Sequence, residues 1–266
     1  SLDTRAEVSV QRRHWEADLG SGLEPGDGRS SIRTTRYRLG IERRLSPDTE
    51  LGLHVGLSDI ARVGTSSLYG IHARWRVSDQ LGLALAFDKD LMEISPRTVF
   101  NDLQRRQTTA TVNWQPGIAH RVSLAASYQD ISDGNARRSL TSVYRYDWIR
   151  SAQWNIDASV AGGWVSFRDD PNTGYYAPSH YRFAGVGIAA YWKISDDDGI
   201  GIDYQTGFQR DETFDRARTY YDVSVHGVFG IFRDWMLRIS AGYSNRQNAA
   251  GGFDARVGSI RIERRF

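Results

Sequence analysis

Large apolar side chains alternate with small or polar ones in the stretch Leu81-Gly82-Leu83-Ala84-Leu85-Ala86-Phe87-Asp88. Successive side chains of a β-strand point to opposite faces of the sheet, so this stretch predicts a strand with one apolar face. The same alternation recurs at 51–58, 69–76, 154–160, 184–192, 200–209, 221–229 and 237–243. We count about fourteen such segments of roughly ten residues, the length that crosses a bilayer at a tilt. The sequence therefore predicts an all-β chain of about fourteen strands, with sixteen as the other possibility.

The composition also favours antiparallel strands over helices. The 266 residues include 26 Gly, 13 Tyr, 10 Phe and 8 Trp but only 6 Pro. The mean hydropathy is -0.51, and the chain has no run of about 18 apolar residues, which excludes a helical membrane protein. The net charge is +2, from 34 basic and 32 acidic residues, and does not point to nucleic-acid binding. The absence of Cys excludes a disulfide framework and a thiolate metal site.

The connections between the expected strands alternate between short and long. Tight turns are expected at 46–48, 78–80, 116–117, 151–153, 195–198 and 233–234. Longer polar connections are expected at 19–30, 59–67, 91–106, 131–138, 168–180, 210–219 and 245–253. Outer-membrane barrels have short periplasmic turns and long extracellular loops. The pattern therefore predicts one antiparallel transmembrane β-barrel over residues 1–266, located in the bacterial outer membrane.

Aromatic residues near the strand ends support this prediction. The expected girdle at the lipid headgroups consists of Trp75, Trp114, Trp148, Trp154, Trp192 and Trp235. The chain also ends on an alternating segment that closes with Phe266, which looks like the insertion signal of outer-membrane barrels. A soluble carbohydrate-binding β-protein is the main alternative, because the apolar face of a strand can equally be a core.

If the apolar faces contact lipid, the opposite faces line the barrel interior. A charge on the lipid face near the midplane costs about 2–4 kcal/mol for Lys or Arg, and facing a wet lumen relieves that cost. The candidates for the lumen and the polymer path are Arg36, Arg38, Glu42, Arg74, Arg76, Asp88, Asp90, Arg145, Asp147, Asp157, Phe183, Tyr191, Asp203, Asp222 and Arg238. The same face carries Arg44, His72, His226, Arg261 and Glu263. Ladders of paired Arg and Asp across neighbouring strands account for most of these charges.

Sugars could follow a path along this inner face. Their hydroxyls bond to guanidinium and carboxylate groups, and their apolar faces stack on aromatic rings. The inward aromatic residues are Phe167, Phe183, Tyr181, Tyr191 and Tyr220. Inward glycines, such as Gly52, Gly82, Gly185, Gly187, Gly201 and Gly207, leave space for a permeant or ease strand curvature. The long connections 91–106 and 168–180 are the candidates for gating.

Catalytic, cofactor and metal sites are not expected. The six histidines, His14, His54, His72, His120, His180 and His226, lie on separate segments outside any nucleophile motif. Ser224 and His226 share a strand face, but alternation makes such pairs common by chance. An outer-membrane lipid hydrolase is kept as an alternative. The run 196–198 of three Asp is interpreted as a solvated turn rather than a calcium site.

Two loop motifs resemble a known family. One is Tyr128-Gln129-Asp130-Ile131-Ser132-Asp133-Gly134-Asn135-Ala136-Arg137, and the other, two strands later, is Gly174-Tyr175-Tyr176-Ala177-Pro178. Their order and spacing resemble the C-terminal barrel of the exopolysaccharide-export porins, including the poly-N-acetylglucosamine porin and the cellulose-export outer-membrane subunit. The resemblance covers roughly residues 122–266. Asp133, Asn135, Tyr175, Tyr176 and Pro178 are the loop candidates for polymer contact, and a structural role is the other interpretation of these turn-forming residues.

The resemblance implies a function as well as a fold. It implies a pore that conducts a hydrophilic polymer and exports an exopolysaccharide, as in biofilm formation. Its implied partners are the outer-membrane bilayer, the polysaccharide, and periplasmic and inner-membrane synthesis machinery. Family members usually carry a periplasmic helical-repeat region before a barrel of about sixteen strands, and this chain is expected to be the barrel without that region. A general or oligosaccharide-selective diffusion porin is the alternative.

Overall fold

The computed structural model describes residues 4–16, 31–93, 96–171, 173–212, 216–232, 235–245 and 255–264. Fourteen strands form one antiparallel sheet, and each strand pairs with the next one along the chain. The strands are β1 (Thr4–Glu16), β2 (Ser31–Ser46), β3 (Thr49–Ile60), β4 (Gly64–Arg76), β5 (Leu81–Leu91), β6 (Gln104–Gly117), β7 (His120–Ile131), β8 (Ala136–Arg150), β9 (Trp154–Phe167), β10 (Tyr181–Lys193), β11 (Gly199–Arg210), β12 (Arg218–Phe232), β13 (Trp235–Ser244) and β14 (Ala255–Arg264). Across the described residues the prediction of about fourteen strands is confirmed, rather than the alternative of sixteen.

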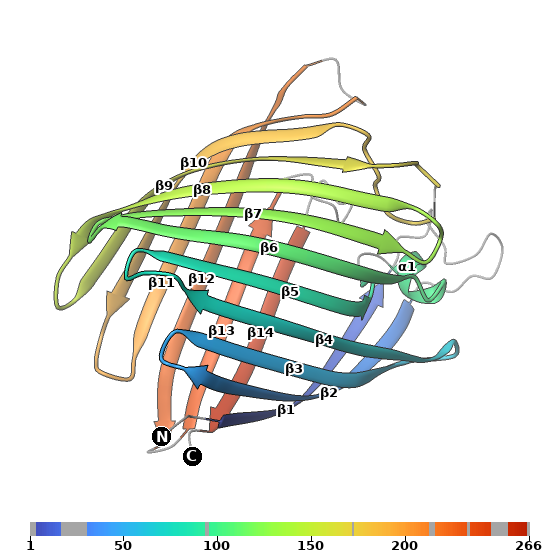
Figure 1. Ribbon diagram of the computed structural model, residues 1–266, viewed down its shortest axis with the longest axis horizontal. Helices are drawn as coiled ribbons and strands as arrows, with labels where there is room; N and C mark the ends of the chain where they lie inside the picture. The colour runs from blue at the N-terminus through green and yellow to red at the C-terminus, as the bar shows by residue number, and fades with distance from the viewer. Residues whose placement is uncertain are drawn as a thin grey trace.

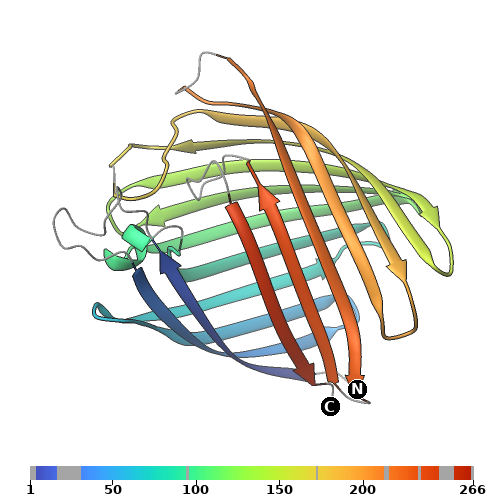
Figure 2. The ribbon, with the colours of Figure 1, turned by 180° about the vertical axis from the view of Figure 1, so that it is seen from behind.

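The sheet curls into a barrel with two different ends. Short hairpin turns lie at one end, and the long connections 92–103 and 168–180 lie at the other, together with the short helix α1 (Pro96–Phe100) (Figure 1). Both termini lie at the turn end, where β1 and β14 come together (Figures 1 and 2). Within the described ranges, no helix is long and apolar enough to cross a bilayer. We call the two ends of the barrel the turn end and the loop end.

Large apolar side chains point outward from the sheet. Mid-strand Leu39, Val55, Val160 and Val186 are 55%, 58%, 54% and 57% exposed. Their neighbours along each strand face the concave side and include the charged residues described below. A soluble sandwich would bury these apolar rows between two sheets, so the soluble alternative is wrong. The outer surface offers hydrocarbon contact along many consecutive strands.

The tryptophans of the expected girdle all lie on this outer surface. Trp75, Trp114, Trp148, Trp154, Trp192 and Trp235 are between 39% and 62% exposed. They belong to strand segments that border the turns, and Trp154 stacks on Trp192 with ring centroids 5.8 Å apart and an interplanar angle of 11°. Amphipathic rings at this position suit the lipid headgroup region. The girdle therefore lies at the turn end.

The expected rhythm of short and long connections is only partly correct. The turns at 46–48, 78–80, 151–153 and 195–198 occur as predicted, and the long connections 91–106 and 168–180 are observed as 92–103 and 168–180. The turn expected at 116–117 lies instead at 118–119, after β6. The expected features at 19–30, at 233–234, at 246–253 and at Phe266 lie outside the described residues.

Two expected long loops are in fact short. β3 runs to Ile60 and β4 begins at Gly64, so the loop predicted at 59–67 has only three residues. The loop predicted at 131–138 is reduced to 132–135. In the first case the ladder continues through the pairs Ser58–Ser66 and Asp59–Thr65. Strand ends that extend beyond the membrane can pair through their backbones without alternating apolar and polar side chains. The polar ends of these strands therefore looked like loops in the sequence.

Inward glycines provide room for neighbouring side chains and backbone. A Cβ at Gly52 would overlap the ring of His72, and a Cβ at Gly201 would overlap the ring of His226. At Gly207 a Cβ would overlap the carbonyl oxygen of Ala184. The predicted role of these glycines in close approach therefore has a physical basis at each of the three sites.

Gly207→Ala is expected to destabilise the barrel by about 1–3 kcal/mol, because the added methyl group would meet backbone that cannot rotate away. The matched control is Gly82→Ala, since the nearest atom to that Cβ is the Trp75 carbonyl oxygen at 3.7 Å. The free energy of unfolding in denaturant is measured for both variants, with the folded fraction monitored by heat-modifiable gel migration. Equal stability of the two variants would contradict the assigned packing.

Candidate functional site in the barrel lumen

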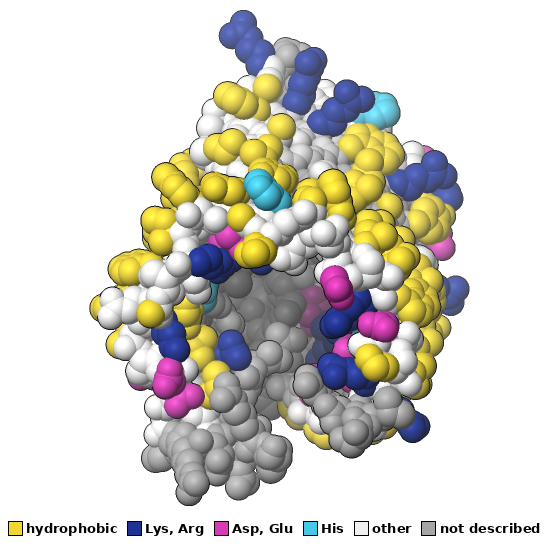
Figure 3. Space-filling model, turned by 60° about the vertical axis from the view of Figure 1, so that its left-hand side comes forward, with side chains coloured by type: hydrophobic (Ala, Val, Ile, Leu, Met, Phe, Trp, Pro, Cys, Tyr) yellow, Lys and Arg dark blue, Asp and Glu magenta, His cyan; other side chains and the backbone are white. Residues whose placement is uncertain are grey.

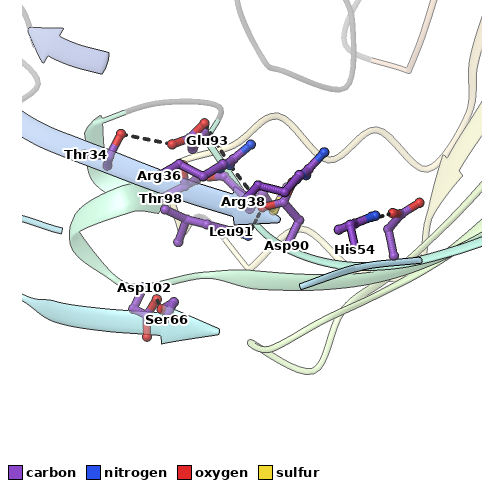
Figure 4. Close-up of polar contacts among 12 residues, drawn as sticks. Thr34, Arg36, Arg38, His54, Ser66, Asp90, Leu91, Glu93, Thr98 and Asp102 are labelled. Carbon is purple, nitrogen blue, oxygen red and sulfur yellow. Dashed lines mark hydrogen bonds and ion pairs between the residues drawn. The ribbon is translucent and has the colours of Figure 1, made fainter. Parts of the chain in front are cut away.

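Charged side chains from non-neighbouring strands meet inside the barrel near the loop end. Arg36 on β2 lies 3.0 Å from Asp90 on β5 and 3.0 Å from Glu93, and Arg38 lies 3.8 Å from Asp90 (Figure 4). Thr34 donates to Glu93 at 3.0 Å. Because β3 and β4 separate β2 from β5, these contacts can form only across the concave face of the sheet. Arg36, Arg38 and Asp90 are thus placed together in the lumen.

A second network lies closer to the turn end, on β2, β3 and β4. Arg74 donates to Glu50 at 2.6 Å and to Glu42 at 3.3 Å, and Nε2 of His72 lies 2.9 Å from Glu42. The ligand atoms of Glu42, Glu50 and His72 lie within 4.8 Å of one another, as a metal site would require. The guanidinium of Arg74 already supplies the cation to both carboxylates. We therefore interpret this group as an ion-pair network.

A third network joins β7, β8 and β9. Arg121 pairs with Asp147, and it lies 3.4 Å from Asp157. Arg150 lies 2.8 Å from Asp147 and 3.0 Å from Asp157. Two aspartates are thus shared between two arginines, and Arg145, next to them on β8, is left outside the network.

The remaining candidates are distributed around the wall. Asp88 lies 3.4 Å from His54, and Ser244 donates to Asp222. Arg238 lies on β13, and the side chains of Arg261 and Glu263 lie outside the described part of the chain. No ion pair is recorded for Arg44, Arg76 or Arg145 among the described residues. Mixed-sign pairing accounts for most of the lumen charges of the described residues, but several pairs join strands that are not neighbours, which differs from the expected ladders.

Ser224 and His226, the Ser–His pair on one strand face, each contact Asp203. Ser224 donates to Asp203 at 3.2 Å, and Nδ1 of His226 lies 3.3 Å from the same carboxylate. Both groups therefore bind Asp203 and not each other. The three aspartates at 196–198 lie in an exposed turn, where Lys193 contacts Asp196 at 2.7 Å.

Two cavities among the described residues lie inside the wall, and the larger of them is at the turn end. The larger has a volume of about 760 Å³ and is lined by residues from β2 to β8 with their turns. The smaller has a volume of about 400 Å³ and is lined by residues from β8 to β13. A space-filling view toward this end shows the molecule hollowed, with basic and acidic side chains at the margin of the hollow (Figure 3). The lumen is accessible and polar at the turn end.

Aromatic side chains fill the interior towards the loop end. Phe167, Tyr181, Phe183 and Tyr220 are only 3%, 3%, 7% and 0% exposed. They form one cluster with Met92 and Leu103 of the β5–β6 connection and with Tyr175 and Ala177 of the β9–β10 connection. These rings pack against one another rather than along an open path. Tyr191 is half-buried and stacks on His226, with centroids 6.0 Å apart.

The two loop motifs bind each other. Asn135 is 3% exposed and donates to the Asp169 carbonyl at 2.7 Å and to the Tyr175 hydroxyl at 2.9 Å. Its own side-chain oxygen accepts from the backbone N–H groups of Ala136 and Asp169. Tyr175 and Thr173 both donate to Asp133. Burial raises the pKa of the Tyr175 phenol far above its ordinary value, and the bond to Asp133 reinforces the shift.

Further contacts hold the β9–β10 connection across the loop end. Tyr176 donates to Asp211, and Pro178 accepts from the backbone N–H of Phe167 at 2.9 Å. Asn101, just after α1, contacts the Thr173 carbonyl at 3.5 Å. The two segments predicted to gate the pore therefore contact each other and the aromatic cluster. We call residues 92–103 and 168–180 together the lid.

Several residues that position the lid could not be found from the sequence. Glu93 binds Thr34 and Arg36 from β2, and Ser66 donates to Asp102. Thr34 and Glu93 lie 59 residues apart in the chain, and Ser66 and Asp102 lie 36 residues apart. Asp211 and Glu212 also bind the lid, but the sequence shows only that they lie in a polar connection.

Glu212 provides a pH-sensitive anchor for the lid. Partial burial opposes its ionisation, but backbone N–H groups of Glu212, Ser179 and His180 donate to the carboxylate and hold its pKa below the ordinary glutamate value. A lowered folded-state pKa stabilises the fold above the unfolded-state pKa, and that contribution is lost as the pH falls through the lowered value. The anchor is therefore intact at neutral pH and weakens in acid.

Glu212→Gln is expected to speed amide hydrogen exchange at Ser179 and His180 about tenfold at neutral pH, because neutral acceptors form weaker bonds than charged ones by about 1 kcal/mol or more. Hydrogen-exchange mass spectrometry measures the effect, with Glu7→Gln on β1 as the control. Unchanged exchange at 179–180 would contradict the anchoring role.

Comparisons with known proteins agree with this architecture. No protein-family model matches the chain, and no curated protein matches it. A solved bacterial polysaccharide outer membrane secretin superposes with a TM-score of 0.71 at 12% identity, over 97% of this chain and 95% of that one. A loop-deletion mutant of OmpT, an outer membrane protein of Vibrio cholerae, gives 0.51 at 8% identity, over 98% of both chains. At such identities the likeness establishes the fold: the chain is a fourteen-stranded β-barrel of the bacterial outer-membrane type.

Proposed function

We propose that the protein is an outer-membrane pore for a hydrophilic polymer, and that it exports an exopolysaccharide. The observation that carries the proposal is the division of the wall: apolar side chains face outward, while charged and polar side chains surround two cavities inside. Guanidinium, carboxylate and hydroxyl groups along this wall can exchange hydrogen bonds with sugar hydroxyls. Many weak contacts without a deep trap are what translocation requires.

The nature of the solute is supported by two independent resemblances. The polysaccharide secretin matches nearly the whole chain in fold. The motifs at 128–137 and 174–178 resemble loops of exopolysaccharide-export porins, and in this chain they lock the lid. Under this proposal the turn end faces the periplasm, where synthesis machinery delivers the polymer.

The lid favours a gated exporter over a permanently open diffusion porin. Residues 92–103 and 168–180 contact each other and pack against the buried aromatic cluster. An open porin needs an unobstructed path, whereas an exporter opens only while polymer passes. Lid displacement is therefore part of the proposed transport cycle.

Planar-bilayer recording of the whole chain tests the proposal. The variant replaces residues 169–177 with a short Gly-Ser linker, and the control replaces the turn 195–198 at the opposite end with the same linker. We expect small conductance for the unaltered chain and the control, and large steps for the lid variant. Oligosaccharide release from vesicles should follow the same order.

Two outcomes would decide against gated export. An unaltered chain as permeable as the lid variant would identify a diffusion porin. A correctly folded lid variant that passes neither ions nor oligosaccharides would refute the pore itself.

A further inference from the structure

Arginines outnumber acidic residues in the lining of the larger cavity. Its lining includes five arginines on β2, β4, β7 and β8, namely Arg44, Arg74, Arg76, Arg121 and Arg145. The acidic residues of the same lining are Asp48, Glu50 and Asp79. Asp48 and Asp79 belong to the turns at the rim of the barrel, and only Glu50 lies on a strand.

Two of these arginines are neutralised within the wall. Arg74 binds Glu50 at 2.6 Å and Glu42 at 3.3 Å. Arg121 pairs with Asp147 and lies 3.4 Å from Asp157. Their charges are thus explained by the stability of the wall.

The charges of the other three arginines are not neutralised by ion pairs with described residues of the wall. Arg145 lies directly opposite Arg121 in the β7–β8 ladder, an unfavourable juxtaposition of like charges. Arg76 lies opposite Gly82, and Arg44 lies opposite Glu50, whose carboxylate is bound by Arg74. All three side chains are exposed, and no carboxylate of the described residues lies within ion-pair distance of them. We call Arg44, Arg76 and Arg145 the open arginines.

The opposite wall has the reverse character. The smaller cavity is lined by Asp157, Asp203 and Asp222, with Arg145 at the boundary between the two cavities. An anion in the lumen would be repelled by Asp203 of that wall and attracted to the open arginines. The path for negative charge therefore follows β2 to β8.

We propose that the open arginines bind the carboxylate groups of an acidic polysaccharide as it enters the barrel from the turn end. The proposal rests on the proposed function and names the substrate class of the same lumen. A guanidinium matches a carboxylate with two parallel hydrogen bonds. Three guanidiniums on three strands of one wall suit repeated charges along a polymer better than one compact anion. Solvent-exposed ion pairs are individually weak, which allows the polymer to move on.

Equilibrium binding tests the inference without requiring an open lid. Isothermal titration calorimetry of the folded whole chain in detergent at low salt would use a hexamer of galacturonic acid as the probe. Maltohexaose serves as the neutral probe of equal length, and inorganic phosphate serves as the compact anion. The variant is Arg44→Gln/Arg76→Gln/Arg145→Gln. The control, Arg62→Gln/Arg106→Gln/Arg138→Gln, removes the same charge from exposed positions towards the loop end.

The expected result is specific to the acidic hexamer. Its affinity should fall at least about tenfold in the variant and stay unchanged in the control, and it should weaken as salt screens the charges. Maltohexaose binding should be the same in all three proteins. The inference would be overturned if the variant bound the hexamer as tightly as the unaltered chain does. It would also be overturned if the open arginines bound inorganic phosphate as tightly as they bind the hexamer.

The conductance experiment separates the two proposals. If the lid variant conducts but the open arginines do not favour the acidic hexamer, the pore stands and the acidic substrate class falls. If the acidic hexamer binds at these arginines but the lid variant conducts nothing, the binding site stands and the pore falls.

Discussion

Asn135→Ala is expected to raise the open probability of the pore about a hundredfold. The buried Asn135 side chain forms four hydrogen bonds, and three of them, with Asp169 and Tyr175, join the β7–β8 turn to the β9–β10 connection. Its removal leaves the Asp169 carbonyl and N–H and the Tyr175 hydroxyl without that partner, at a cost of about 3 kcal/mol to the closed lid. Since each 1.4 kcal/mol is a factor of ten, the equilibrium shifts by about two powers of ten. Single-channel recording at fixed voltage measures it.

Asn101→Ala is the matched control for this variant. Asn101 lies in the other lid segment, is exposed, and makes a single 3.5 Å contact with the Thr173 carbonyl. Its replacement should leave gating nearly unchanged. If Asn101→Ala and Asn135→Ala opened the pore equally, the lock between the two motifs would not control the lid.

Val186→Arg is expected to destabilise the folded barrel in a bilayer by about 2–4 kcal/mol, because an outward-facing mid-strand charge must enter hydrocarbon. Val186 on β10 pairs with Val160 on β9, and both side chains are more than half exposed on the outer surface. Reversible denaturant unfolding from phospholipid vesicles gives the free energy of unfolding for the variant and for the unaltered chain.

The control places the same charge on the other face. Ser159 is the next residue before Val160 along β9 and lines the smaller cavity. Ser159→Arg should change the free energy of unfolding far less than Val186→Arg does. A larger penalty for Ser159→Arg would mean that the faces of β9 and β10 have been assigned in reverse.

The strand count and the two faces of the wall could be predicted from the sequence because they follow from a period of two. Stretches such as 81–88 show an outward Leu row and an inward row of Gly, Ala and Asp without knowledge of any distant residue. The six girdle tryptophans followed from the same logic. Connection lengths were less predictable, since the polar ends of β3 and β4 continue their ladder beyond the membrane.

The site was less predictable than the fold because its contacts join strands that are not neighbours. Alternation placed Arg36 and Asp90 on the inner face, but only the curvature of the sheet brings β2 to β5. The pairing of Asn135 with Tyr175 spans 40 residues and depends on the loop conformation. The inner aromatic residues were expected to line a sugar path, and packing with Met92 and Leu103 buries all of them but Tyr191.

The loop motifs had two interpretations in the sequence, and the geometry favours one of them. Asp133, Asn135 and Tyr175 direct their polar atoms at each other. Direct contact of these residues with polymer stays a prediction for the open lid. In the structure these residues have a structural role, because they join the β7–β8 turn to the β9–β10 connection.

Single-cysteine scanning along β7 is the most direct test of the division between lipid and water. The chain has 0 Cys, so each introduced thiol reports alone. Residues 122–127 would be replaced one at a time, and each protein reconstituted in vesicles would be treated with a small charged maleimide. Labelling is expected at 123, 125 and 127, and protection is expected at 122, 124 and 126. Uniform labelling, or labelling of the opposite set, would contradict this division.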